Sequence, residues 1–325
     1  MFKNYFKIAW RNITRHKAYS ALNIAGLSIG MACSILILLW VQDELSYDRF
    51  NTNANELYRL TCNAGDFKAA VSPAGMAEGL QSRMPEIKST VRLSKPSTNL
   101  LEVGARKFEE KRGFFVDSNF LQVFSYKLLK GNAASALQRP DAILITEDMA
   151  KKYFGDEEAL GKIIRRDNRE NCIVTGILEN APSNSHLQFD FILPISSIAN
   201  TEYDLKNKVW GNFNYYTYLQ LNKNITPSSA AFSKLVPQIQ KIYKEHNPDL
   251  KVDFHLQPLT DIHLHSDLQI DLPGKGNVQY VNIFFIVALF IIAVACGIYG
   301  SDIAEVNSII TALHYKILCI AFAGG

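Results

Sequence analysis

Two long apolar blocks dominate the hydrophobic pattern along the chain. One covers residues 18–41 and the other residues 277–300, and neither contains an acidic or basic side chain. An α-helix rises about 1.5 Å per residue, so roughly 20 apolar residues cross a hydrocarbon core about 30 Å thick. The pattern therefore predicts a membrane protein with transmembrane helix 1 at residues 18–41 and transmembrane helix 2 at residues 277–300.

A cleaved signal peptide is the alternative interpretation of the first block. Its basic flank suits a signal, but the apolar core of a signal is only about 7–15 residues long. This block continues through Trp40 and Val41 without a cleavage site of small residues. Both features favour a retained membrane anchor.

The charges beside the two blocks predict the orientation. Residues 1–17 contain five basic side chains and no acidic one, whereas residues 301–325 contain two acidic side chains and one lysine. Because basic flanks stay in the cytoplasm, we expect a cytoplasmic N-terminus, an exported domain at residues 42–276 and a second helix that returns inward. The exported domain is close to neutral, so its charge gives no support for nucleic acid as a partner.

Residues 1–17 also predict a cytoplasmic amphipathic helix at the membrane interface. At about 100° per residue, Phe2, Phe6 and Trp10 share one face, while Arg11 and Arg15 lie on the opposite face. Rings in the acyl boundary and cations near lipid phosphates are typical of interfacial helices. These five side chains are therefore candidate membrane-interface and coupling residues. A basic topology signal without further function is the alternative.

Small residues recur inside the first apolar block. Gly26 and Gly30 form a GxxxG pattern, which lets the backbone of a second helix approach closely in lipid. These two glycines are candidate helix-packing residues, although the pattern does not identify the partner helix.

The exported domain combines helical and strand patterns. Helix signals occupy residues 72–84, 146–155 and 226–246, with Ser72 and Thr146 as N-terminal caps. Strand-like runs occupy residues 142–146, 172–178, 213–219 and 252–256, and residues 182–185 have the composition of a turn. Interleaved helices and strands predict an α+β fold class with mixed α/β layers.

No catalytic motif stands out in the sequence. The segment from Gly155 to Gly161 and Lys162 approaches a phosphate-binding loop, but its spacing is one residue too long. Ile163 also occupies the position where Ser or Thr would bind magnesium. We therefore expect a non-catalytic chain that has no ATPase of its own and binds no cofactor directly.

Two histidines are weak candidates for a metal site. His263 and His265, flanked by Asp261 and Asp267, would share one face of a strand and could approach a divalent cation. The alternative is the solvated face of a strand that buries Leu264 on its other side. Histidine spacing alone is a weak signal, so the prediction is no metal site.

Cys62 and Cys172 are the only cysteines in the exported domain. A disulfide between them is permitted outside the cytoplasm. Two buried, unpaired thiols are an equally acceptable interpretation, and both stay open.

Several segments, taken in order, resemble the MacB/FtsX-type ABC-transporter permeases. At the start of the chain they are residues 7–17 (KIAWRNITRHK), 23–30 (NIAGLSIG), 43–50 (DELSYDRF) and 57–60 (LYRL). In the exported domain they are residues 145–155 (ITEDMAKKYFG), 174–176 (VTG), 182–186 (PSNSH) and 259–266 (LTDIHLHS). The resemblance extends from residue 1 to about residue 296.

This resemblance implies a MacB-like periplasmic core domain at residues 42–276 and the start of an FtsX-like permease domain at residues 277–300. The periplasmic domain would have two lobes, with residues 105–205 roughly forming the inserted one. The chain would lie in the cell inner (plasma) membrane and work in export or mechanotransmission, including efflux of antimicrobial peptides. Its implied partners are the lipid bilayer, an ABC ATPase that supplies ATP hydrolysis, a second copy or related permease, and a periplasmic adaptor or outer-membrane factor.

The tail at residues 301–325 departs from the family pattern. The family continues into a basic cytoplasmic stretch and two more membrane helices, whereas here Asp302 and Glu305 replace cations. We interpret the atypical tail as a truncation or frameshift after about residue 296.

Two other classes of protein share part of this pattern. A transmembrane sensor also places a periplasmic ligand-binding domain between two helices, but it needs a cytoplasmic signalling module. A membrane-anchored enzyme needs a catalytic constellation. The permease is the leading hypothesis and the sensor its alternative.

Overall fold

The computed structural model describes residues 10–11, 14–15 and 17–299. The chain divides into two compact units. The helical unit holds the described residues up to Leu45 together with those from Asn277 onward, and the α/β unit spans Ser46–Gly276. The predicted tail at residues 301–325 lies outside the described residues.

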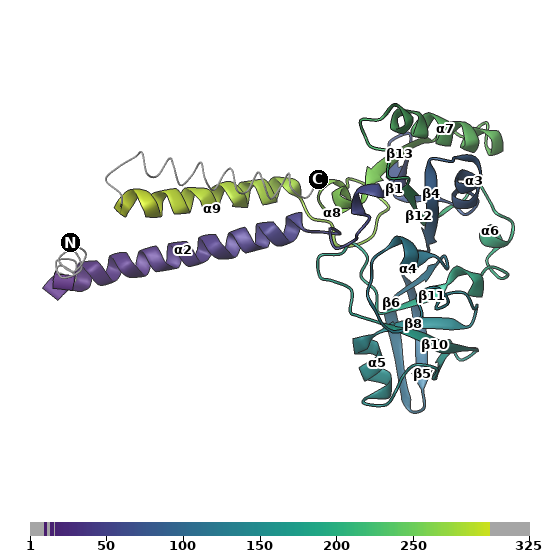
Figure 1. Cartoon of the computed structure of the whole chain (residues 1–325), viewed down its shortest axis with the longest axis horizontal. Helices are drawn as coiled ribbons and strands as arrows, with labels where there is room; N and C mark the ends of the chain where they lie inside the picture. The colour runs from purple at the N-terminus through teal and green to yellow at the C-terminus, as the bar shows by residue number, and fades with distance from the viewer. Residues whose placement is uncertain (1–9, 12–13, 16, 300–325) are drawn as a thin grey trace. The chain divides into compact units, whose positions relative to one another are not determined.

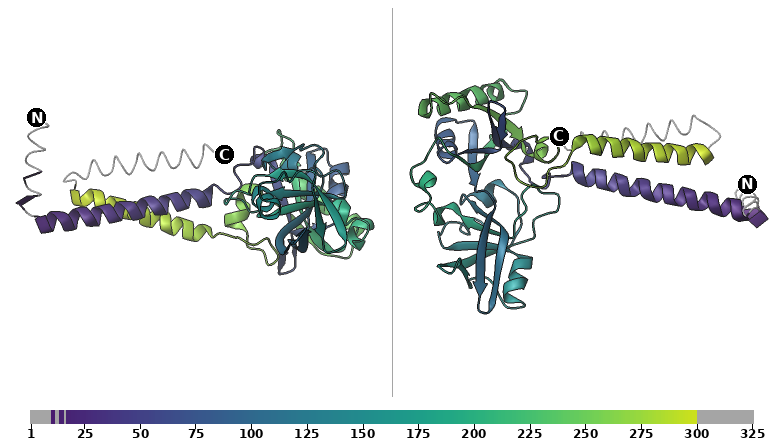
Figure 2. Two further views of the ribbon diagram at one scale, coloured as in Figure 1. Left: turned by 90° about the horizontal axis from the view of Figure 1, so that it is seen from below. Right: turned by 180° about the vertical axis from the view of Figure 1, so that it is seen from behind.

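Two apolar helices form the described part of the helical unit. Helix α2 (Lys17–Leu45) and helix α9 (Val278–Tyr299) lie side by side (Figures 1 and 2). The ring of Trp40 meets that of Phe284 edge-on, with their centroids 5.3 Å apart. Within α2, Ser20–Leu45 is long and apolar enough to cross a membrane, judged by length and composition, while the apolar stretch of α9, Val278–Val294, is shorter.

The α/β unit contains short helices and a large set of strands (Figure 1). The helical segments are η1 Ala54–Glu56, α3 Met76–Arg83, α4 Phe120–Val123, α5 Glu147–Phe154, η2 Ile195–Ser197, α6 Tyr203–Lys206, α7 Ala230–His246, η3 Leu259–Asp261 and α8 Ile262–His265. The strands are β1 Leu57–Ala64, β2 Phe67–Ala69, β3 Val71–Pro73, β4 Ile87–Leu93, β5 Ser97–Val103, β6 Arg106–Val116, β7 Leu128–Gly131, β8 Ala142–Thr146, β9 Ile163–Arg166, β10 Glu170–Leu178, β11 Phe191–Pro194, β12 Phe213–Leu221 and β13 Asp253–Pro258.

One part of this unit, the sheet lobe, is an open antiparallel sheet. Its strands run in the order β4-β12-β1-β13, with β3 added to β12 and β2 added to β1. Helix α3 packs against β4 and helix α7 against β13. Helix α7 is amphipathic, and its buried residues Leu235, Ile239 and Tyr243 belong to the same hydrophobic core as Phe254 of β13. Burial of this helical face gives the lobe its hydrophobic stabilisation.

The other part, the barrel lobe, is a closed ring of strands. Strand β6 pairs with β11, which pairs with β8; β8 pairs with β10, β10 with β9, β9 with β5, and β5 again with β6. The ring encloses a second hydrophobic core that includes Leu101, Ile145, Val174 and Phe191. A ladder between β4 and β6, registered at Leu93 and Val116, joins the two lobes. The inserted lobe predicted at about 105–205 overlaps the span of this ring.

Several local predictions are confirmed. The Thr146 hydroxyl accepts a hydrogen bond from the Met149 amide and caps α5, and Gly155 ends that helix with a φ of 67°. The predicted strands coincide with β8, β10, β12 and β13 or lie largely within them. Residues 182–185 contain a turn, as predicted.

Two helix starts were wrong. Ser72 does not cap a helix: it lies in β3, where its hydroxyl donates a 2.7 Å hydrogen bond to Thr217 of β12, and α3 begins only at Met76. Pairing with a buried strand outweighed the Ser-Pro capping signal. Helix α7 begins at Ala230 after a Ser229 cap, because Thr226 starts a turn in which the Ser229 amide donates to its carbonyl.

Gly113 tests the packing of the barrel. A Cβ at this position would overlap the Phe191 ring, so Gly113→Ala should lower the free energy of unfolding by about 1–3 kcal/mol through overpacking. The matched control is Gly211→Ala, whose Cβ would have its nearest neighbour, Asn247 Oδ1, at 3.9 Å. Denaturant unfolding of the full chain, followed by circular dichroism, measures both. Equal stability of the two variants would contradict this packing.

Candidate functional site

The chain enters the α/β unit at Ser46 and leaves it at Gly276. We call residues 46–51 the first connector and residues 266–276 the second connector. Along the sequence, the first follows α2 directly and the second ends just before α9. Both are held by buried polar side chains, and we call these contacts the junction.

Asp48 fixes the first connector. Its backbone has a φ of 60°, and its amide donates a 2.8 Å hydrogen bond to the carbonyl of Asn184. The Asn184 side-chain amide donates in turn to the Ser46 hydroxyl at 2.8 Å. Asp48 Oδ1 lies 2.7 Å from His186 Nδ1, off the line of a hydrogen bond, and accepts a hydrogen bond from the His186 backbone amide at 3.2 Å. The connector is thereby bonded to residues 182–186.

A buried hydrogen bond links His186 to the sheet lobe, and we call this pair the relay. His186 Nε2 is 2.7 Å from the hydroxyl of Tyr218, a fully buried residue of the central strand β12. Burial raises the pKa of the Tyr218 hydroxyl, so it stays neutral. Beside the relay, the Tyr126 hydroxyl lies 2.7 Å from Ser185 Oγ. Because hydrogen bonds between buried groups are directional, this network favours one arrangement of its segments, although Asp48 Oδ2 and His186 Nδ1 are buried without a hydrogen-bond partner among the described residues.

Asp271 fixes the second connector to β1. Arg59 Nη1 and Nη2 donate to its two carboxylate oxygens at 2.6 and 3.1 Å, and Arg59 Nη2 also donates to Gln257 Oε1 at 2.8 Å. The side chains are 0% and 1% exposed, so this is a fully buried ion pair. Burial alone would raise the pKa of Asp271, but the charge and hydrogen bonds of Arg59, with those of Ser266 and the Leu272 amide, hold it below its ordinary value.

His263 lies between the two connectors. Its ring stacks on that of Tyr47 with centroids 3.4 Å apart and an angle of 4° between the planes. Its Nδ1 lies 3.0 Å from the Gly274 carbonyl oxygen, and its own carbonyl accepts a 2.9 Å hydrogen bond from the Gly276 amide. A cavity of about 10 Å³, roughly the size of one water molecule, lies among His186, His263 and Asp271.

The predicted strand geometry of the two histidines was wrong. Residues 262–265 form the short helix α8, in which His263 is buried and His265 is exposed. The helix follows directly on the 3-10 turn η3, which ends the extended run of β13 at Pro258. Among the residues that the structure describes, no three or more His, Cys, Asp or Glu side chains are grouped so that they could hold a metal ion.

The two cysteines of the exported domain are both free and buried. Cys62 lies in β1 of the sheet lobe and Cys172 in β10 of the barrel lobe, so the structure has the two thiols rather than a disulfide. Burial raises the pKa of each thiol to about 11, which makes both poor nucleophiles.

The candidate interface and helix-packing residues fall in or before the helical unit. Phe2 and Phe6 lie outside the described residues, whereas Trp10, Arg11 and Arg15 are helical and exposed. A Cβ on Gly30 would lie 3.5 Å from Ile291 of α9, so this glycine faces the second helix. Gly26 has no neighbour within 4 Å of such a Cβ.

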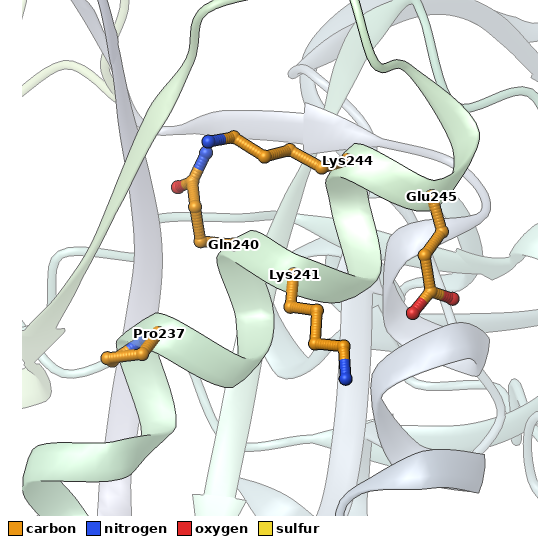
Figure 3. A pocket seen from close by; sticks show the side chains of 5 residues that line it. All are labelled: Pro237, Gln240, Lys241, Lys244 and Glu245. Carbon is orange, nitrogen blue, oxygen red and sulfur yellow. The ribbon is translucent and has the colours of Figure 1, made fainter.

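Helix α7 carries a surface pocket of about 520 Å³ (Figure 3). Pro237, Gln240, Lys241, Lys244 and Glu245 line it. The Gln240 amide is already used, because its Oε1 accepts from the Phe254 amide at 3.2 Å and its Nε2 donates to the Val252 carbonyl. Glu245 pairs with Arg83 at 2.6 Å. This pocket offers two lysines but no constellation for catalysis.

Sequence reasoning singled out His263, as a weak metal candidate, but not the other residues that form the junction. Asp48, His186 and Asp271 are not spaced like catalytic residues or metal ligands. Asp48 and His186 occur only within segments that resemble the MacB/FtsX-type permeases. Arg59 had a detectable signal: it is a charge inside the apolar run 57–60 of a strand, where a cation needs a buried partner. The sequence could not supply that partner, 212 residues further on.

The α/β unit is thus a closed barrel beside a helix-covered sheet, with both connectors held at one buried junction. The model of the family described as "MacB-like periplasmic core domain" matches residues 20–233. The chain belongs to this family.

Three solved structures are similar to this chain, and the first of them shares its fold. A domain of a putative permease protein from Porphyromonas gingivalis is 23% identical with a TM-score of 0.56, and the match covers 73% of this chain and 99% of that one. The periplasmic region of MacB from Actinobacillus actinomycetemcomitans (17% identity, TM-score 0.47) is covered over 91% of its length and 64% of this chain. The extracellular domain of the noncanonic ABC-type transporter YknZ from Gram-positive bacteria (14%, TM-score 0.44) is covered over 99% and 62%. No protein of curated function matches the sequence.

Asp271→Asn tests the energetic weight of the junction. The substitution leaves the Arg59 charge buried without a counter-charge, so the free energy of unfolding should fall by about 3–5 kcal/mol. Glu245→Gln removes the same charge from the exposed Arg83 pair and should change little. Denaturant unfolding of the full chain compares them. If both variants lost a similarly small free energy of unfolding, the buried Arg59–Asp271 pair would not have the proposed weight.

The same pair predicts an acid-sensitive stability. The pKa of Asp271 is lower in the folded chain than its unfolded value of about 3.9, so its contribution is complete above that pH and is lost as the pH falls below it. Stability measured from pH 7 downward should therefore drop below about pH 4. In Asp271→Asn the free energy of unfolding should fall less steeply as the pH is lowered. An unchanged pH dependence would show that other carboxylates cause the loss of stability.

Proposed function

We propose that this chain is the permease subunit of a MacB-like ABC transporter, which couples ATP hydrolysis by a separate ATPase to movement of the α/β unit. The observation that carries the proposal is the junction: both connectors are bonded into the core of the unit at one place. A displacement of either helix would therefore reach the unit through ion pairs and hydrogen bonds. Family membership supports the same role.

The apolar helices support a place in the membrane. Most side chains of α2 are exposed within its unit, including Leu22, Ile29 and Leu36, which a soluble protein would bury. We propose that α2 and α9 both span the inner membrane, with the N-terminus in the cytoplasm and residues 42–276 in the periplasm. The basic residues before α2 support this orientation.

The role requires no chemistry from this chain. The junction side chains are buried and bonded to other segments of the chain, so they hold those segments in place. We propose a non-catalytic subunit that binds no cofactor and uses ATP through its partner. Trp10, Arg11 and Arg15, with Phe2 and Phe6, would form the coupling region beside that ATPase.

A second membrane partner is part of the proposal. Gly30 already faces α9, whereas Gly26 leaves space for another helix at the same GxxxG pattern. A second copy of this chain or a related permease would occupy that space. A periplasmic adaptor or outer-membrane factor would contact the α/β unit in export or mechanotransmission, with antimicrobial peptides among the candidate cargoes.

Co-purification tests the proposed function. The full chain, expressed in its own membrane, should retain an ABC ATPase on a pull-down. The double variant Arg11→Glu/Arg15→Glu should lose it through charge reversal in the coupling region. Lys241→Glu/Lys244→Glu makes the same change on α7 and should retain it (Figure 3). Recovery of a signalling protein in place of an ATPase would favour the sensor.

A further inference from the structure

A surface pocket, which we call the α3 pocket, lies beside the join between the two lobes. Its lining residues come from helix α3, from strand β4 and from residues 117–119, directly after β6. All of them lie within the α/β unit and outside both connectors. The pocket has a volume of about 380 Å³, within the range of roughly 300–1,000 Å³ that is typical of small-molecule sites.

The lining of the α3 pocket is almost entirely polar. Of the residues that the structure describes as lining it, only Ala77 is apolar, and this residue is buried together with Thr90. The others carry charges, amides or hydroxyls. Sites for apolar ligands are lined mainly by apolar and aromatic side chains, so this composition favours a polar ligand.

The charges of the pocket balance within ion pairs. Arg92 Nε and Nη2 donate to the two carboxylate oxygens of Asp117 at 3.0 and 2.8 Å. The Glu78 carboxylate accepts a 2.7 Å hydrogen bond from Lys208 Nζ. Because each charge has a counter-charge beside it, the pocket selects neither an anion nor a cation, and a neutral ligand fits it best.

The backbone of Thr90 fixes two amide side chains of the pocket. The Thr90 amide can only donate, so the Gln81 atom that it meets at 3.2 Å is the oxygen Oε1. The Thr90 carbonyl can only accept, so the Asn119 atom that it meets at 3.0 Å is the nitrogen Nδ2. Gln81 Nε2 and Asn119 Oδ1 are left without a hydrogen-bond partner among the described residues. The pocket thus has a free donor and a free acceptor on side chains whose orientation is fixed.

A free hydroxyl completes the bonding capacity. Ser118 Oγ has no hydrogen-bond partner in the described part of the chain, and it can both donate and accept. Ligand hydroxyls also do both, so they can accept from Gln81 Nε2 and donate to Asn119 Oδ1. A peptide matches the pocket less well, since Ala77 gives its side chains little apolar surface.

We propose that the α3 pocket binds a small neutral saccharide through its hydroxyl groups. The amides of Gln81 and Asn119 are already held in place, so little side-chain entropy is lost when the ligand binds. The site adds a ligand to the chain and depends neither on an ATPase nor on a membrane partner.

Saturation-transfer NMR of the full chain in phospholipid nanodiscs tests the site. Nanodiscs are used because the sugar head groups of maltoside detergents would compete. The probes are glucose, N-acetylglucosamine and maltose, and at least one should bind with a Kd of roughly 1–10 mM. Absence of saturation transfer to all three sugars would overturn the proposal.

Gln81→Glu places the sugar in the α3 pocket. The glutamate keeps an oxygen for the Thr90 amide but replaces the free donor with an acceptor, so sugar binding should weaken about tenfold. Gln238→Glu makes the same change on the exposed face of α7 and should leave the Kd unchanged. Equal Kd values for Gln81→Glu and the unaltered chain would refute the site. If Gln81→Glu fails to fold, Ser118→Ala replaces it, because it removes a hydroxyl without breaking a bond within the described residues.

Two further probes test the ligand class. N-Acetylglycinamide offers an amide donor and acceptor without hydroxyls, and glucose 6-phosphate adds a negative charge. Both should bind at least about tenfold more weakly than the best sugar. Tighter binding of N-acetylglycinamide would replace the saccharide with a peptide backbone, and tighter binding of glucose 6-phosphate would replace it with an anion.

The site and the permease role can fail separately. Sugar binding without a co-purifying ATPase would retain the site and remove the permease role. A co-purifying ATPase without sugar binding would retain the role and remove the site.

Discussion

The buried pair of Arg59 and Asp271 is the constraint on which the α/β unit depends. It joins residues 212 positions apart in sequence and so ties the end of the unit to its first strand. Desolvating two charges is costly, and only their mutual attraction and the further bonds from Gln257 and Ser266 offset that cost. Removing one partner therefore lowers the stability of the fold far more than replacing both partners with apolar side chains would. Such an interaction adds little net stability but allows one closing geometry.

Hydrophobic contacts and polar bonds have different roles in the α/β unit. The larger hydrophobic core contains residues of both lobes, such as Leu57 of β1 and Leu178 of β10, whereas directional bonds to buried side chains fix where the connectors attach. Hydrophobic burial is tolerant of small shifts, and paired charges are not. The α/β unit thus combines continuous hydrophobic cores with a few directional bonds that hold the two connectors.

Local signals in the sequence predicted much of the secondary structure but not the arrangement of the lobes. The Thr146 helix cap and the alternation of apolar and polar residues in β12 depend only on neighbouring residues, so both could be predicted from the sequence. Ser72 carried an equally good cap signal, yet pairing of β3 with β12, more than 140 residues away, decided its conformation. Closure of the ring depends on the pairing of β6 with β11, for which no local pattern exists. The junction could not be predicted for the same reason, because its bonds join residues far apart in the sequence and no local pattern identifies the partner of each one.

Closure of the barrel has a consequence for how one copy of this chain can meet another. A strand at the edge of a sheet exposes amides and carbonyls to which a strand of another molecule can add. In the ring of β5, β6, β8, β9, β10 and β11 each strand pairs with a neighbour on both sides, so those groups are bonded within the ring. At β13, the end of the described sheet order, the Gln240 amide bonds the backbone of Val252 and Phe254 instead. Strand addition from another molecule is therefore disfavoured at the ring and at the end of β13.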